Sequence, residues 1–135
     1  MAHLLAELNP SLYVLANMEN LKAEQVFERA TAFVEILHAA HPQTPILLVE
    51  PVRFSHAFLQ PNVDRDILQK RTELRRAFET LLRNGVSGLH YMYGDALYGE
   101  DGEAAVDGVH ATDLGFLRQA DALEPLLRQL LENSR

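Results

Sequence analysis

The most chemically useful side chains lie in the stretch Val106–Phe116, which reads Val-Asp-Gly-Val-His-Ala-Thr-Asp-Leu-Gly-Phe. Two residues, one of them a glycine, separate Asp107 from His110. A histidine that acts as a general base needs a carboxylate to fix its tautomer and to stabilise the imidazolium that forms during reaction. A single turn could deliver both side chains to one point, where a nucleophile on another loop could meet them.

The four-residue pattern is not specific by itself. An Asp-x-x-His occurs often by chance, and it more often marks a turn aspartate or a distant helix cap beside an ordinary loop histidine. His38 and His41 have a spacing that could bind a metal, but no further ligand is near them. Their place at the negative end of an expected helix explains them better. His56 and His90 belong to no pattern and are interpreted as structural.

The length and composition are typical of one soluble globular domain over residues 1–135. The formal net charge of −7 argues against a nucleic-acid partner, because phosphate binding needs clustered Lys and Arg. The densest basic stretch falls on an expected helix and is interpreted as a solvated face; it contains Lys70, Arg71, Arg75 and Arg76.

The absence of cysteine excludes disulfides, thiol catalysis and cysteine-based zinc sites. The apolar runs are too short to span a bilayer, so no membrane partner is expected, and the first residues lack the features of a signal peptide. The cellular location stays unknown at this stage.

Three short apolar runs predict buried strands, at residues 12–16, 45–50 and 89–93. Apolar residues at helical spacing predict helices from about 22 to 41 and from about 63 to 83. Residues 2–8 are expected to end a preceding helix. Thr112 can cap a final helix with one apolar side, formed by Leu114, Leu117, Leu123, Leu127 and Leu130.

This alternation of strands and helices predicts a three-layer α/β fold, in which helices cover both faces of a parallel sheet. Functional groups in such sheets lie in the loops beyond the carboxyl ends of the strands. Three segments occupy that edge, at residues 17–20, 51–61 and 94–112. The alternation alone would also suit a flavodoxin-like regulatory domain.

The stretch Val106–Leu114, followed by Ala120–Pro125, resembles the last conserved block of SGNH (GDSL-like) hydrolases, in a branch of bacterial esterases. Leu12–Asn20, Thr44–Glu50 and the Gly94-Asp95 pair fit the same branch in the same order, so the resemblance covers nearly the whole chain. It implies a flavodoxin-like SGNH hydrolase fold. It also implies a serine esterase acting on small acyl or acetyl esters, with carbohydrate esters among the candidates, and it implies no metal or organic cofactor.

The resemblance assigns roles to three residues. Asp107 and His110 would be the acid and base of a Ser-His-Asp triad, and Asn20 would donate to the oxyanion hole, with Asn17 as the reserve. The asparagine block departs from the commoner Gly-x-Asn-Asp pattern, because Met18 and Leu21 stand where glycine and aspartate would be. A cap on the helix that begins near residue 22 is an equally good interpretation of Asn20.

The family's Gly-Asp-Ser-like segment is missing from this sequence. Ser11 and Ser87 precede strands, Ser134 lies in the tail, and Ser55 lies on the expected edge but lacks the turn glycine. We therefore expect a fold truncated at its amino-terminal strands, which begins just before the family's third strand. Without the serine, the chain alone should be inactive as an esterase.

The missing strands would leave the strand at residues 12–16 without a neighbour on one side. We expect a second copy of the chain, or a missing amino-terminal segment, to cover this edge. The alternative to an esterase is a non-catalytic interaction module built on a truncated hydrolase-like fold. An in-frame Gly-Asp-Ser segment upstream of Met1 would favour the enzyme, whereas a genuine start codon there would favour the module.

Overall fold

The computed structural model describes residues 1–133, and Ser134 lies outside the described residues. Three strands form one parallel sheet in the order β1-β2-β3, at Tyr13–Leu15, Ile46–Val49 and Leu89–Met92. Leu47 of β2 lies between Val14 of β1 and His90 of β3 in the register. The predicted parallel sheet is confirmed, and each strand is shorter than its apolar run.

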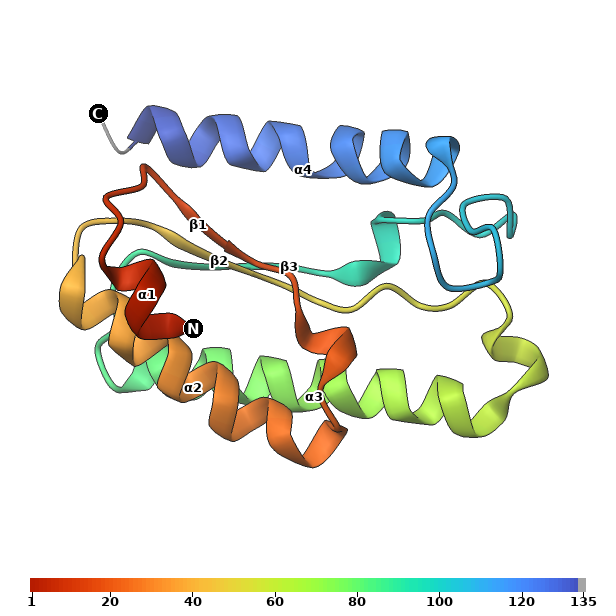
Figure 1. The fold of residues 1–135 in the computed structure, drawn as a ribbon, viewed down its shortest axis with the longest axis horizontal. Coiled ribbons are helices and arrows are strands. Elements are labelled where there is room, and N and C mark those ends of the chain that lie inside the picture. The colour runs from red at the N-terminus through yellow and green to blue at the C-terminus, as the bar shows by residue number, and fades with distance from the viewer. Residues whose placement is uncertain (134–135) are drawn as a thin grey trace.

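Helices cover both faces of this sheet, so the predicted three-layer fold is confirmed (Figure 1). One face carries α1 (Ala2–Ala6), α2 (Ala23–Ala40) and α3 (Pro61–Arg83), and the other carries α4 (Asp113–Asn133). Three short 3₁₀ helices lie in the connections: η1 (Met18–Asn20), η2 (Ala57–Leu59) and η3 (Gly94–Ala96). Within residues 1–133, no helix is both long enough and apolar enough to cross a bilayer.

Alternate strand residues divide the core into two apolar clusters, because successive side chains point to opposite faces. Tyr13, Leu15 and Leu48 pack with α2 and α3, whereas Leu47 and Val49 pack with α4. The central strand β2 is buried on both faces. Val14 of β1 remains 42% exposed, so the α4 face of the sheet is not fully covered at this edge.

The starts of α4 and α2 test the predicted caps Thr112 and Asn20. The Thr112 hydroxyl accepts a hydrogen bond from the Gly115 N–H at 3.1 Å, which confirms the predicted cap of α4. Helix α2 begins after Lys22, whose own N–H donates to the Gln25 side chain at 3.2 Å. Asn20 lies in η1, before this start, and the structure gives it no capping hydrogen bond there. The helix-cap interpretation of Asn20 is therefore wrong.

The interpretation of the basic stretch as a solvated face is wrong for two of its members. Lys70 and Arg71 are 7% and 5% exposed, because their spacing from Ile67 and Leu74 places them within the buried stripe of α3. The Lys70 ammonium group pairs with the Asp66 carboxylate at 2.8 Å. Burial of these charges is offset by hydrogen-bond and ionic partners of the Lys70 ammonium and of the Arg71 Nε and Nη1 atoms, whereas the buried Arg71 Nη2 has no hydrogen-bond partner among the described residues.

The final helix is also less buried than its pattern predicts. Leu123, Leu127 and Leu130 pack on the sheet, but Leu114 and Leu117 are 39% and 57% exposed. The first turns of α4 extend beyond the strands, over the connection that follows β3 (Figure 1). Its apolar side therefore meets the core only along the later turns.

Candidate active site

The connections that follow the three strands all leave the same edge of the parallel sheet, as the sequence predicts (Figure 1). Helix η1 follows β1, residues 50–60 follow β2, and η3 with residues 97–112 follows β3. The second and third connections touch directly, since the Ser55 N–H donates to the Gly108 carbonyl at 2.9 Å. This edge is where the Asp107–His110 turn lies.

Asp107 and His110 form a hydrogen-bonded pair. The His110 Nδ1 lies 2.7 Å from one Asp107 carboxylate oxygen. The other oxygen accepts the backbone N–H groups of Val109 at 2.9 Å and of His110 at 2.8 Å. This side-chain-to-backbone turn is the reason that a spacing of two residues brings the ring onto the carboxylate.

Gly108 makes the turn possible in two ways. Its φ of +88° lies in the left-handed region that favours glycine. A Cβ at this position would lie 2.5 Å from the His56 Nδ1, whose ring contacts the Gly108 carbonyl at 3.2 Å. Any side chain here would push apart the connection after β2 and the turn that carries His110.

The base of the turn is closed by backbone pairing. Ala105 and Ala111 form an antiparallel bridge, and the Val106 N–H donates to the His110 carbonyl at 2.8 Å. The Thr112 N–H donates to the Ala104 carbonyl at 2.9 Å. Residues 105–111 therefore form a small closed loop immediately before α4.

The electrostatics of the pair suit a general base. The His110 backbone N–H, followed by its imidazole and the Val109 N–H, holds the pKa of Asp107 well below its usual range. A permanent carboxylate fixes the Nδ1–H tautomer of a neutral imidazole and leaves the Nε2 lone pair free. The His110 side chain is 81% exposed, and no group within residues 1–133 is hydrogen-bonded to its Nε2.

The candidate asparagines follow β1. Asn20 and Asn17 are both exposed, and η1 is held to α3 because the Lys70 ammonium donates to the Glu19 carbonyl at 3.0 Å. Tyr98 is affected by both this segment and the turn. Burial raises the pKa of its hydroxyl, and the Glu19 carboxylate of η1 and the Asp107 carboxylate of the turn raise that pKa further. The structure shows no direct contact between Asn20 and His110.

A buried ionic network that the sequence interpretation missed lies beneath this edge. One Glu50 carboxylate oxygen accepts from Arg75 at 2.9 Å and from the Tyr91 hydroxyl at 2.7 Å, and the other accepts the Gly94 N–H at 3.1 Å. Burial, then the Glu50 carboxylate, raises the pKa of Tyr91. The Arg71 Nε donates to the Pro51 carbonyl at 2.9 Å.

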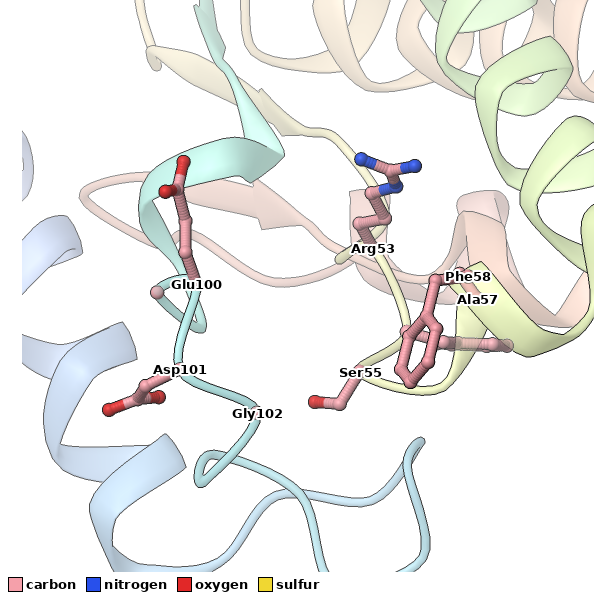
Figure 2. Close-up of a pocket in the computed structure, with 9 residues that line it drawn as sticks. Arg53, Ser55, Ala57, Phe58, Glu100, Asp101 and Gly102 are labelled. Atoms are coloured by element: carbon pink, nitrogen blue, oxygen red, sulfur yellow. The ribbon is translucent and has the colours of Figure 1, made fainter.

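A hollow of about 400 Å³ lies between the connections after β2 and β3. Its lining consists of Arg53, Phe54, Ser55, Ala57, Phe58, Gly99, Glu100, Asp101 and Gly102. Figure 2 shows the Ser55 hydroxyl pointing into this hollow, whereas Asp101 points toward α4, where Arg118 binds it at 2.6 Å. Neither Asp107 nor His110 lines the hollow.

The structure shows no hydrogen bond between His110 and any described serine. Within residues 1–133, no hydrogen bond joins the Ser55 hydroxyl to His110. Ser11 lines a separate hollow at the start of β1, and Ser87 precedes β3, so both lie at the opposite end of the strands. Among the described residues, the Asp107–His110 pair therefore has no serine hydroxyl hydrogen-bonded to it.

The chain is similar to known proteins over nearly its whole length. The model of the GDSL-like lipase/acylhydrolase family matches residues 1–128. A solved structure from Bacteroides ovatus, described as a GDSL-like lipase, has a TM-score of 0.93 and 25% identity and covers 97% of this chain. The salicylyl-acyltransferase SsfX3 of a tetracycline biosynthetic pathway has a TM-score of 0.76 and 22% identity and covers 96% of this chain.

The matched region is only part of each solved chain. The alignments cover 39% of the Bacteroides ovatus protein and 40% of the acyltransferase, so this chain spans about two fifths of either length. No curated protein sequence matches the chain.

Proposed function

Because the chain belongs to the GDSL-like lipase/acylhydrolase family, we propose that it supplies the acid and base of a Ser-His-Asp triad in a serine esterase. The proposed substrates are small acyl or acetyl esters, with carbohydrate esters among them. The observation that carries this proposal is the 2.7 Å contact between the His110 Nδ1 and the Asp107 carboxylate, which leaves Nε2 free. The site needs only a hydroxyl nucleophile to perform acyl transfer.

The proposed reaction has two steps. A serine from a segment outside residues 1–135 attacks the ester carbonyl, His110 Nε2 takes the serine proton and delivers it to the departing alcohol, and an acyl-serine remains. Water then attacks the acyl-serine carbonyl while His110 takes a proton from the water; the acyl–serine bond breaks, the carboxylic acid leaves, and His110 returns the proton to the serine oxygen. Asp107 stabilises the imidazolium in both steps, and the Asn20 amide donates to the tetrahedral oxyanion. No step calls for a metal or an organic cofactor.

Within this proposal, residues 1–135 alone hydrolyse no ester, because they lack the Gly-Asp-Ser segment and no described serine is hydrogen-bonded to His110. The same observation favours a second candidate function, a non-catalytic interaction module on a hydrolase-like fold. The DNA upstream of Met1 separates the two. An in-frame Gly-Asp-Ser segment supports the esterase, and a genuine start codon at Met1 supports the module.

Replacing His110 with alanine tests the catalytic role in the full-length gene product. We expect His110→Ala to lower kcat for p-nitrophenyl acetate by roughly 10⁴-fold or more, because the serine loses its base. The matched control is His3→Ala, which removes an exposed histidine from α1 and should leave kcat unchanged. Full activity in His110→Ala, with an unchanged circular dichroism spectrum, would remove the role from this residue.

We also propose that the free side of β1 is covered in solution, by a second copy or by an amino-terminal segment. Strand β1 pairs with β2 and is the edge of the described sheet. After the strand, an apolar hollow of about 540 Å³ lies between η1 and α2, with Met18, Leu21, Phe33 and Ile36 in its lining. Apolar surface next to unpaired strand groups favours association.

A further inference from the structure

Tyr98 is a buried tyrosine in the connection between β3 and α4. It is 7% exposed and packs in the apolar cluster beneath α4, together with Leu97 and Leu130. Its hydroxyl donates to the Val109 carbonyl at 2.8 Å. A buried ring thus places a hydrogen-bond donor against the turn that carries His110.

The Val109–His110 peptide group is held on both sides. Its carbonyl accepts from the Tyr98 hydroxyl, and its N–H donates to the Asp107 carboxylate at 2.8 Å. A peptide group is rigid and planar, so two opposed hydrogen bonds fix its rotation about the neighbouring single bonds. The Cα of His110 is attached to this plane, which sets the direction in which the imidazole leaves the backbone.

Tyr98 is itself anchored by Arg118. The Arg118 guanidinium donates to the Tyr98 carbonyl at 2.7 Å and to both Asp101 carboxylate oxygens at 2.6 Å. Gly99, with φ of +75°, allows this approach, because a Cβ there would lie 3.0 Å from the Arg118 Nη1. The support for the turn therefore extends from α4 through Arg118 and Tyr98 to the peptide before His110.

We propose that Tyr98 is a positioning residue, whose hydroxyl holds the Val109–His110 peptide so that the imidazole stays on Asp107 and presents Nε2 outward. The catalytic consequence rests on the proposed function, whereas the hold on the turn does not. Support from a buried group is needed because the His110 and Asp107 side chains are 81% and 54% exposed. Exposed ion pairs contribute little to holding their own geometry.

The hydroxyl is suited to this task at ordinary pH. Burial, followed by the Glu19 and Asp107 carboxylates, raises the pKa of Tyr98, so the hydroxyl keeps its proton as a donor. Glu19 lies on η1 and Asp107 on the turn, so the Tyr98 hydroxyl senses the charge of both candidate site segments.

The test is Tyr98→Phe in residues 1–135, which keeps the ring and removes the donor. Long-range ¹H–¹⁵N NMR of the His110 ring reports its tautomer, and hydrogen exchange reports the His110 amide. We expect the Nδ1–H tautomer to dominate in the unmodified chain and the variant to gain Nε2–H tautomer. The His110 amide should exchange about three- to tenfold faster, the loss expected for one hydrogen bond.

The matched control is Tyr13→Phe. Tyr13 is 6% exposed and donates to the Leu5 carbonyl at 3.1 Å, at the opposite end of the strands. The Tyr13→Phe variant removes the same kind of hydrogen bond and should leave the His110 tautomer and the exchange rate of the His110 amide unchanged. Equal effects from the two variants, or no effect from Tyr98→Phe, would overturn the proposal.

Two further measurements separate the possible failures. In the unmodified chain, the Tyr98 hydroxyl proton should exchange slowly with water because it is buried and hydrogen-bonded; a rapidly exchanging hydroxyl proton would overturn the proposal even if Tyr98→Phe does not fold. In an active full-length gene product, Tyr98→Phe should lower kcat about three- to tenfold with KM unchanged. A tautomer shift without activity in any variant would overturn the proposed esterase but leave the role of Tyr98 in the turn standing.

Discussion

Asp107 organises the turn through both of its carboxylate oxygens. One oxygen orients the His110 ring, and the other accepts the two backbone N–H groups that close the turn. The same carboxylate therefore determines where the backbone runs and which ring nitrogen carries the proton. These two tasks are coupled, because losing the negative charge weakens all three hydrogen bonds together.

The titration of Asp107 tests this coupling. Because the folded pKa is lowered, ionisation of Asp107 stabilises the turn above the unfolded pKa of about 4, and this contribution is lost as pH falls through the folded pKa. We expect the ¹³C carboxyl signal of Asp107 to titrate with a midpoint below about 3.9.

His110→Ala provides the control for that titration. The variant removes the imidazole but keeps the two backbone N–H donors, so the midpoint should rise only part of the way toward the ordinary value. A midpoint at or above that of an aspartate in an unstructured peptide would show that the carboxylate does not hold the turn.

The sequence identified only some of the residues at this edge. The catalytic roles of Asp107 and His110 come from the family resemblance and stay predictions. Their hydrogen-bonded pairing could be predicted, because it depends on local spacing within one short turn. Tyr98 could not, since its hydrogen bond to Val109 depends on how an irregular segment folds back under α4. Asn20 was predicted from the family resemblance, and its catalytic role stays a prediction.

At the scale of elements, side chains of α3 bind the connections that follow the strands. Lys70 binds the backbone of η1, while Arg71 binds the Pro51 carbonyl after β2 and the Asp95 carboxylate of η3 at 2.5 Å. One helix thus contacts the connections that follow all three strands. The sequence shows that Lys70 and Arg71 fall in the apolar stripe of α3, but their charges favour exposure, and the buried partners that offset these charges come from other elements.

Glu50 is the acidic centre of this arrangement, and Glu50→Gln tests it. Whichever way the amide turns, its NH₂ group must face donors that the carboxylate now accepts, from Arg75 and Tyr91 or from Gly94. Arg71 lies 3.6 Å away and would lose its buried countercharge. We expect the free energy of unfolding to fall by about 3–5 kcal/mol in urea denaturation.

An exposed ion pair gives the comparison for this substitution. Glu124→Gln disrupts a surface pair with Arg128 on α4, in which the two side chains are 56% and 71% exposed. That variant should change the free energy of unfolding by less than about 0.5 kcal/mol. If the two substitutions cost the same, the Glu50 network does not stabilise the fold.

Strands and crossover helices were predictable because burial alone fixes them. The runs around β1, β2 and β3 are apolar and bounded by turn residues, and the periodicity of α2 and α3 requires packing against the sheet. The exposure of Leu114 and Leu117 could not be predicted from the helix sequence. It depends on the length of the sheet, which determines how far α4 stays covered and which follows from strand pairing.

At the scale of the whole molecule, strand β1 has a neighbouring strand on one side only, so it forms an edge of the described sheet. Val14 of this strand is apolar and 42% exposed. For residues 1–135 by themselves, the cover available is a second copy. Pairing of the same edge from two copies would satisfy the strand groups of both.

Analytical ultracentrifugation of residues 1–135 should therefore show a dimer at high concentration. Val14→Lys should raise its dissociation constant by about tenfold or more, because a charge would enter the apolar contact. The matched control is Val106→Lys, at a valine 76% exposed on the distant loop, which should leave dimerisation unchanged. A chain that stays monomeric at every concentration would contradict this expectation.

The order of the strands in space is the order in which they are synthesised, β1 to β3. Nascent chains fold from the amino terminus, so the sheet and its α2–α3 layer can assemble while the rest is still within the ribosome. The turn around His110 depends on Thr112 and Arg118, which emerge afterwards. The Asp107–His110 turn is thus completed after the sheet, and a chain stalled before α4 would hold its sheet without this hydrogen-bonded turn.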